Sequence, residues 1–133
     1  MVASTVELRN IAGTQAAIGW AGSHTVVVDR PCGKAGGAGI GFNGAQLLAL
    51  AIGGCYCNDL RYVSHELGRD IDELAVSVTI ELDGAPLVAT GAVLSVRVQM
   101  RDGDDPSPII EEAWRICTVA NSLKEAFPVE MTH

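Results

Sequence analysis

The chain has 133 residues, of which 48% are hydrophobic and 19% are charged, so it can bury the core of one compact domain and has no room for a second. Its formal net charge of −7 repels phosphate backbones and anionic membrane surfaces, which argues against nucleic-acid and membrane partners. Aromatic residues make up only 5%, and the mean hydropathy of +0.26 is high for a small monomer. We therefore expect a homodimer that covers part of the apolar surface.

The N-terminal sequence MVASTVELRN lacks the basic start and apolar stretch of a signal peptide. No apolar run approaches the roughly 18 residues that a membrane helix requires. We therefore expect a cytoplasmic protein, in which the four cysteines are reduced rather than joined in structural disulfides.

The N-terminal third contains three short extended segments, around Val6–Asn10, Gln15–Trp20 and His24–Asp29. Gly13 and Gly22 separate them at turn positions. This pattern predicts a small meander of strands.

The segment Pro31–Gly44, PCGKAGGAGIGFNG, contains six glycines and is expected to be a mobile loop. Gly39, Gly41 and Gly44 match the spacing GxGxxG of dinucleotide-binding sites. That fingerprint requires a strand running directly into the first glycine and a βαβ unit around it, and neither condition is met here. A nucleotide cofactor is therefore not expected.

Residues Ala45–Leu67 form a long apolar run rich in leucine and alanine, followed by Gly68 as a C-terminal stop. We predict a long, largely buried helix of roughly 35 Å, which would cross the whole domain. Two strands with alternating apolar residues follow at Leu74–Leu82 and Leu94–Met100. An antiparallel hairpin through GAPLVATG is the simplest connection between them.

A second helix is predicted from Ser107, as the N-cap, to about Lys124, with Pro108 at its first helical position. A last short strand is expected at Phe127–Met131. The order of strands and helices predicts an α+β fold of one domain over residues 1–133, with antiparallel sheets, a long central helix and a second, cysteine-bearing helix.

Cysteine is the residue type with the most chemical information. Cys55 follows Gly53 and Gly54 in the middle of the long helix, where each glycine costs about 1 kcal/mol relative to alanine. These missing side chains would let another element approach the thiol, and helical periodicity turns Cys117 of the second helix inward. A Cys55–Cys117 pair is therefore sterically allowed, while the alternative is that both are small core residues. Cys55 and Cys57 point about 200° apart around the helix, which argues against a joint metal site.

Two stretches that contain these cysteines resemble a known family. GFNGAQLLALAIGGCYCNDL resembles the first cysteine helix of the OsmC/Ohr superfamily, and AWRICTVANSL followed by FPVEM resembles its second cysteine motif. The resemblance covers most of the chain. It implies an intertwined α+β homodimer with central long helices and two thiol sites at the subunit interface.

The resemblance also implies an activity, that of a thiol-dependent peroxidase that reduces organic hydroperoxides in antioxidant stress defence. Cys55 would be the peroxidatic thiolate and Cys117 the resolving thiol. An external dithiol would restore both thiols, and no cofactor or metal is expected.

The sequence departs from the pattern of the active hydroperoxide reductases at several positions. Ala45 stands where they carry a glutamate, no arginine stands clearly at the matching N-terminal site, and Thr118 stands where a proline is common. Gln46 and Asp59 are the auxiliary candidates near the site, and Cys32 and Cys57 are candidates for a secondary redox role or for packing. The alternative function is a non-catalytic OsmC-like dimer that binds an apolar small molecule.

Overall fold

The computed structural model describes residues 1–132, which divide between Leu47 and Leu48 into two compact units. We refer to residues 1–47 as unit 1 and to the residues from 48 onward as unit 2. The single domain expected over residues 1–133 stays a prediction, and its last residue, His133, lies outside the described residues.

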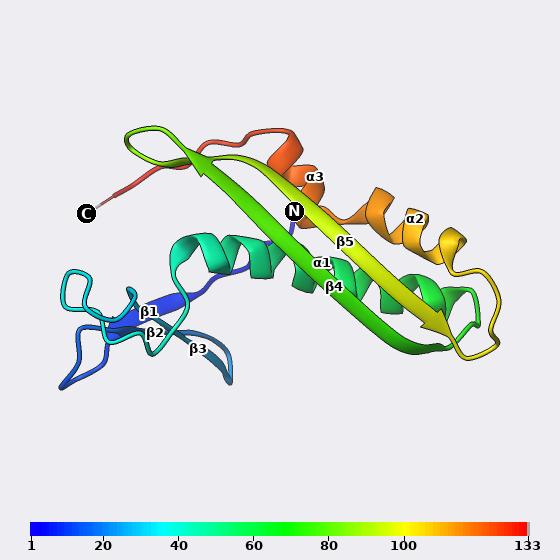
Figure 1. Cartoon of the computed structure of the whole chain (residues 1–133), viewed down its shortest axis with the longest axis horizontal. Helices are drawn as coiled ribbons and strands as arrows, with labels where there is room; N and C mark the ends of the chain where they lie inside the picture. The colour runs from blue at the N-terminus through cyan, green and yellow to red at the C-terminus, as the bar shows by residue number, and fades with distance from the viewer. Residues whose placement is uncertain (133) are drawn as a thin grey trace. The chain divides into compact units, whose positions relative to one another are not determined.

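Unit 1 contains a three-stranded antiparallel sheet in the order β1–β2–β3 (Figure 1). The strands are β1 (Glu7–Asn10), β2 (Ala17–Ala21) and β3 (His24–Val28). The connections contain Gly13 and Gly22, whose φ angles of 80° and 59° lie in the left-handed region that favours glycine. The predicted meander is therefore confirmed.

The glycine-rich segment that follows β3 is a loop without helix or strand, as predicted, and it is folded back on itself. The buried carboxylate of Asp29 accepts the backbone N–H groups of Ala38 and Ile40 at 3.0 and 3.2 Å. A side chain at Gly41 would collide with the backbone carbonyl of Val27, because the two chain segments run so close together. The glycines thus permit close backbone approach, and one carboxylate ties the segment to the sheet.

Unit 2 is built from one hairpin and three helices. Helix α1 (Gly44–Glu66) leads into it, and the antiparallel strands β4 (Ile71–Asp83) and β5 (Val88–Met100) follow. The chain then forms α2 (Ser107–Ile116) and α3 (Thr118–Lys124). None of the helices within residues 1–132 is long and apolar enough to cross a bilayer.

The hairpin alternates as predicted, with one face turned toward the helices and the other toward solvent (Figure 1). Gly53 of α1 lets the helix approach the hairpin, because a Cβ there would lie 3.1 Å from Val78 Cγ2. Gly54 has no such neighbour within 4 Å. The buried core joins α1, both strands, α2 and α3, and consists of Tyr56, Leu60, Val63, Ile71, Val98, Met100, Ile109, Ala113, Cys117 and Ala120.

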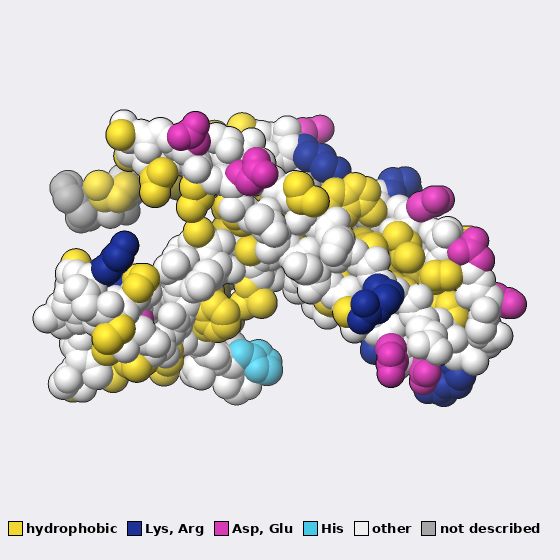
Figure 2. Space-filling view, in the orientation of Figure 1, with side chains coloured by type: hydrophobic (Ala, Val, Ile, Leu, Met, Phe, Trp, Pro, Cys, Tyr) yellow, Lys and Arg dark blue, Asp and Glu magenta, His cyan; other side chains and the backbone are white. Residues whose placement is uncertain are grey.

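Charged side chains gather at the end of unit 2 where α1 leads into β4 and β5 leads into α2 (Figure 2). Arg69 forms an ion pair with Asp102 at 3.1 Å, and Arg101 forms a longer one with Asp70 at 3.5 Å. The two loops at this end are thereby joined by ion pairs.

The second predicted helix is interrupted, contrary to expectation. Cys117 adopts an extended conformation with φ −62° and ψ 107°, so α2 ends before it and α3 begins after it. The start of α2 also differs by one residue, because Pro106 rather than Ser107 occupies the N-cap position. The side chain of Asp105 accepts both the backbone N–H and the hydroxyl of Ser107, which fixes that start.

The strand predicted at Phe127–Met131 is absent from the chain as described over residues 1–132. A strand is defined by its hydrogen-bonded partner, and no strand of the described residues pairs with this segment. Phe127, Val129 and Met131 remain exposed at alternate positions.

Candidate functional site

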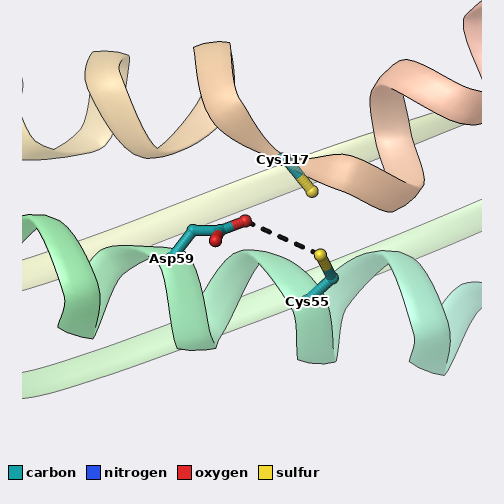
Figure 3. A group of neighbouring side chains, drawn as sticks. All are labelled: Cys55, Asp59 and Cys117. Atoms are coloured by element: carbon teal, nitrogen blue, oxygen red, sulfur yellow. Dashed lines mark hydrogen bonds between the residues drawn. The ribbon is translucent and has the colours of Figure 1, made fainter. Parts of the chain in front are cut away.

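Two cysteines and one carboxylate converge inside unit 2. The Sγ atoms of Cys55 and Cys117 and a carboxylate oxygen of Asp59 all lie within 4.8 Å of one another (Figure 3). The thiol of Cys55 donates a hydrogen bond to Asp59 Oδ2 at 3.6 Å. The sequence analysis selected all three residues, and the structure brings them together.

Helical geometry explains the pairing of Cys55 with Asp59. The two residues are four apart in α1, and side chains at this spacing lie on the same face of a helix, one turn apart. Figure 3 shows both side chains directed toward the α2–α3 segment. One face of α1 therefore presents a thiol and its hydrogen-bond acceptor together.

The helix break explains the position of Cys117, whose sulfur points toward α1 (Figure 3). The carbonyl of Cys117 accepts the backbone N–H of Asn121 at 2.9 Å, as the first hydrogen bond of α3. The side-chain amide of Asn121 also donates to the carbonyl of Arg115 at 3.0 Å, across the break. The extended residue is thus held between two helix ends, and its side chain is fully buried.

The environment of the two thiols differs. Burial raises the pKa of the Cys117 thiol, and the neighbouring Cys55 and Asp59 raise it further, while the backbone N–H of Ala120 acts in the opposite direction. Cys117 is therefore a neutral thiol at neutral pH. Cys55, in contrast, is only half-buried and is the more accessible sulfur of the pair.

Tyr56 fixes α1 against α2 next to the two cysteines. Its ring is fully buried and meets Trp114 edge to face, with ring centres 5.8 Å apart. Its hydroxyl donates to the carbonyl of Ile110 at 3.0 Å, and burial raises its pKa to about 12, with smaller contributions from Cys117 and Cys57. No signal in the sequence points to this positioning role, because the bond joins residues 54 apart in the chain.

The other sequence candidates lie outside this cluster. Gln46 and Asn43 exchange backbone-to-side-chain hydrogen bonds of 2.9 Å, which form a capping box at the start of α1. Cys32 is exposed in unit 1. Cys57 is half-buried, and burial raises the pKa of its thiol against a smaller opposing effect of Arg61. Gln46 is thus a helix-capping residue.

Among residues 1–132, Cys55, Asp59 and Cys117 are also the single group of three or more metal-ligating side chains whose ligand atoms lie close together. The arrangement supports two kinds of chemistry, thiol–disulfide redox chemistry and coordination of a cation.

The sequence from residue 36 to residue 132 matches the family model described as OsmC-like protein. This match covers more than half of the chain, so the protein belongs to the OsmC-like family, as the two cysteine motifs predicted. No curated protein matches the sequence.

Solved structures support the same fold. An OsmC-like protein of unknown function from Vibrio cholerae superimposes with a TM-score of 0.76 at 11% identity, over 91% of this chain and 93% of that one. An OsmC-like protein from Mycoplasma pneumoniae gives 0.76 at 14% identity, over 93% and 89%. The organic hydroperoxide resistance protein OhrB of Bacillus subtilis gives 0.61 at 20% identity, over 93% and 92%. The chain therefore has the α+β fold of the OsmC and Ohr proteins, as predicted.

Proposed function

We propose that the protein is a thiol-dependent peroxidase that reduces organic hydroperoxides through Cys55 and Cys117. The observation that carries this proposal is the convergence of the two sulfurs, from α1 and from the α2–α3 break, with the carboxylate of Asp59. The similarity to a structure named as an organic hydroperoxide resistance protein adds support at the level of fold.

In the first step, the sulfur of Cys55 attacks the terminal oxygen of the hydroperoxide. The S–O bond forms as the O–O bond breaks, which leaves Cys55 as a sulfenic acid and releases an alcohol. Asp59 accepts the thiol proton along the existing hydrogen bond and returns a proton to the departing alkoxide. Asp59 would thus act as the proton acceptor and donor in a chain that has Ala45 where the active hydroperoxide reductases carry a glutamate.

In the second step, the thiol of Cys117 attacks the sulfenic sulfur of Cys55, so that a disulfide forms and water leaves. The two sulfurs start within 4.8 Å, whereas a disulfide bond is about 2.05 Å long, so a small local movement closes the bond. An external dithiol then reduces the disulfide and is itself oxidised. This cycle requires no bound cofactor.

The difference in burial supports the roles that we propose for the two cysteines. Cys55 is half-buried and can meet a substrate from solvent, while Cys117 is fully buried and can meet only its neighbour. Cys55 is therefore the attacking sulfur and Cys117 the resolving one. A reduced dithiol centre also fits the cytoplasm, which we propose as the compartment.

We also propose that the protein works as a homodimer. The helices of unit 2 cover one face of the two-stranded hairpin, and much of the rest of its apolar surface remains exposed. Large apolar side chains of unit 2 are exposed in the single chain, and a second copy would cover them. They include Leu50, Tyr62, Leu87, Val88, Val93, Phe127, Val129 and Met131. Sedimentation as a monomer at micromolar concentration would contradict this part of the proposal.

The test of the activity is the consumption of cumene hydroperoxide by reduced protein with dithiothreitol as the electron donor. We expect that the wild type and Cys57→Ser will turn over, that Cys55→Ser will not, and that Cys117→Ser will accumulate oxidised Cys55. Consumption of cumene hydroperoxide by Cys55→Ser would contradict the proposal, and so would a wild type that does not consume it.

A second candidate function rests on a different feature, an apolar groove of about 320 Å³ in unit 2. Its lining includes Leu48, Ile52, Ile80 and Lys124. A non-catalytic protein would use such a groove to bind an apolar molecule. In that case an apolar fluorescent probe binds without any hydroperoxide turnover, and Ala89→Trp, which fills the groove, abolishes binding.

A further inference from the structure

We propose that the reduced protein binds a thiophilic divalent cation, with Zn²⁺ as the reference ion, through the sulfurs of Cys55 and Cys117 and the carboxylate of Asp59. This inference goes beyond the proposed peroxidase activity, because coordination needs the same three side chains but no peroxide and no turnover.

The distances fit a tetrahedral ion. With Zn–S near 2.3 Å and Zn–O near 2.0 Å, a tetrahedral angle separates a sulfur and an oxygen ligand by about 3.5 Å and two sulfurs by about 3.8 Å. The Cys55 Sγ to Asp59 Oδ2 distance is 3.6 Å, and every pair in the group is within 4.8 Å. A shift of about 1.3 Å or less in any of these distances therefore completes the geometry.

The charges in the group also favour a cation. Asp59 takes part in no ion pair with any lysine, arginine or histidine of residues 1–132, and the hydrogen bond from Cys55 is the one contact described for its carboxylate. Arg61, two positions further along α1, instead donates to the carbonyl of Ile71 at 3.3 Å. A divalent cation would compensate the negative charge that residues 1–132 leave without an ion-pair partner here.

The ligand set selects the class of ion. Two thiolates with one carboxylate suit zinc and other thiophilic metals, whereas Mg²⁺ and Ca²⁺ prefer sites made of oxygen alone. Cys55 and Asp59 are half-buried, so the fourth coordination position faces an accessible side and can hold water. The ligands are also held in place, since two lie one turn apart on α1 and Tyr56 joins this helix to α2.

Metal binding would regulate the redox chemistry, a consequence that rests on the proposed function. A bound ion occupies both sulfurs and releases their protons, so Cys55 is no longer free to attack a peroxide. Conversely, a Cys55–Cys117 disulfide has no thiolate to offer and would release the ion. The reduced site therefore holds either a metal or a reacting peroxide.

The test uses Co²⁺ as a spectroscopic probe with metal-free protein reduced by a phosphine, which competes weakly for metal. We expect one equivalent of Co²⁺ to produce a thiolate-to-cobalt charge-transfer band with the visible bands of a tetrahedral site, and one equivalent of Zn²⁺ to remove both. Cys55→Ser and Cys117→Ser should weaken binding at least about 100-fold, since loss of even an outer-shell partner costs about 10–100-fold. Asp59→Asn should weaken it about 10-fold or more.

Cys57→Ser and Cys32→Ser are the matched controls, because each removes a thiol outside the group, and both should bind as the wild type does. Absence of the charge-transfer band in the wild type, its survival in Cys117→Ser, or its loss in Cys57→Ser would each overturn the proposal. If Asp59→Asn binds Co²⁺ with the affinity of the wild type, Asp59 is not the third ligand.

A measurement without mutation guards against misfolded variants. Protein oxidised to the Cys55–Cys117 disulfide should bind no Co²⁺ and recover binding on reduction, and binding by the disulfide form would contradict the site. Peroxide turnover is measured separately in the presence of a chelator. If turnover is absent while cobalt binding follows the expected pattern, the peroxidase proposal fails and the metal site stands.

Discussion

Unit 1 and unit 2 each contain an aspartate that is at least partly buried, Asp29 and Asp59. The two carboxylates differ in how many hydrogen bonds they accept. In unit 1, the carboxylate of Asp29 is buried and accepts backbone N–H groups from Arg30, Ala38 and Ile40. In unit 2, the carboxylate of Asp59 is half-buried and accepts one weak hydrogen bond, from the thiol of Cys55. A carboxylate whose oxygens are all hydrogen-bonded to the backbone stabilises the fold. A carboxylate beside a thiol that can still accept further hydrogen bonds is free for proton transfer or metal coordination.

The largest effect should come from Cys55→Ser. Because the proposed reaction passes through this sulfur, hydroperoxide turnover should fall by at least about 10³-fold. The initial rate of cumene hydroperoxide loss measures the change. Cys57→Ser, two residues away in the same helix, should keep the wild-type rate, and an equal loss in that control would mean that the helix rather than the Cys55 sulfur is at fault.

Asp59→Asn should reduce kcat/KM by about 10²-fold, because the amide cannot accept and return a proton as the carboxylate does. The free energy of unfolding should change by about 1 kcal/mol or less, since this carboxylate takes part in no ion pair within residues 1–132. Asp70→Asn is the matched control, an exposed carboxylate in the same unit. Unchanged kinetics in Asp59→Asn would remove Asp59 from the mechanism.

Tyr56→Phe should lower the free energy of unfolding by about 1 kcal/mol, because it removes one buried hydrogen bond between α1 and α2 and leaves the carbonyl of Ile110 unpaired. The ring and its contact with Trp114 are kept. Urea denaturation measures the difference. A variant as stable as the wild type would show that this bond does not hold the two helices in register.

The smallest and most local effect concerns the pH response of unit 1. The backbone N–H of Ile40 lowers the pKa of Asp29 most strongly, with further lowering from Ala38 and Arg30 against the opposing effect of burial. The carboxylate therefore stabilises the folded segment above about pH 3.9, the usual value for an unfolded aspartate, and this contribution is lost as the pH falls through the lower folded value. The amide proton shifts of Ala38 and Ile40 should report that titration.

Asp29→Asn is the control for this response. It should abolish the titration of the two amide shifts and loosen the segment at neutral pH. If the amide proton shifts of Ala38 and Ile40 in the wild type titrate with a pKa at or above that of an unfolded aspartate, Asp29 does not stabilise the segment as described.

Local patterns were enough to predict most of the fold. Strict alternation placed the hairpin, and the glycines of the first turns placed the meander. Part of the site could also be predicted from the sequence, because the spacing of Cys55 and Asp59 places both side chains on the same face of α1. Helical periodicity also predicted that Cys117 turns inward; it is buried, although it lies at the break between α2 and α3 rather than on a helix face.

The features that the sequence did not predict depend on contacts that helical or strand periodicity does not show. The break at Cys117 is held by a bond from Asn121 to the carbonyl of Arg115, which the helical periodicity of this segment does not reveal. The compact glycine-rich segment depends on Asp29, whose backbone donors lie 9 and 11 residues away. The strand expected at Phe127–Met131 has no partner strand in residues 1–132, and alternation alone cannot supply one.

The most direct test of the two-cysteine site is peptide mapping by mass spectrometry after reduced protein has reacted with one equivalent of cumene hydroperoxide. We predict a single new disulfide between Cys55 and Cys117, with Cys32 and Cys57 still alkylated as free thiols. A disulfide from Cys55 to Cys32 or Cys57, or four thiols left unchanged, would contradict the account.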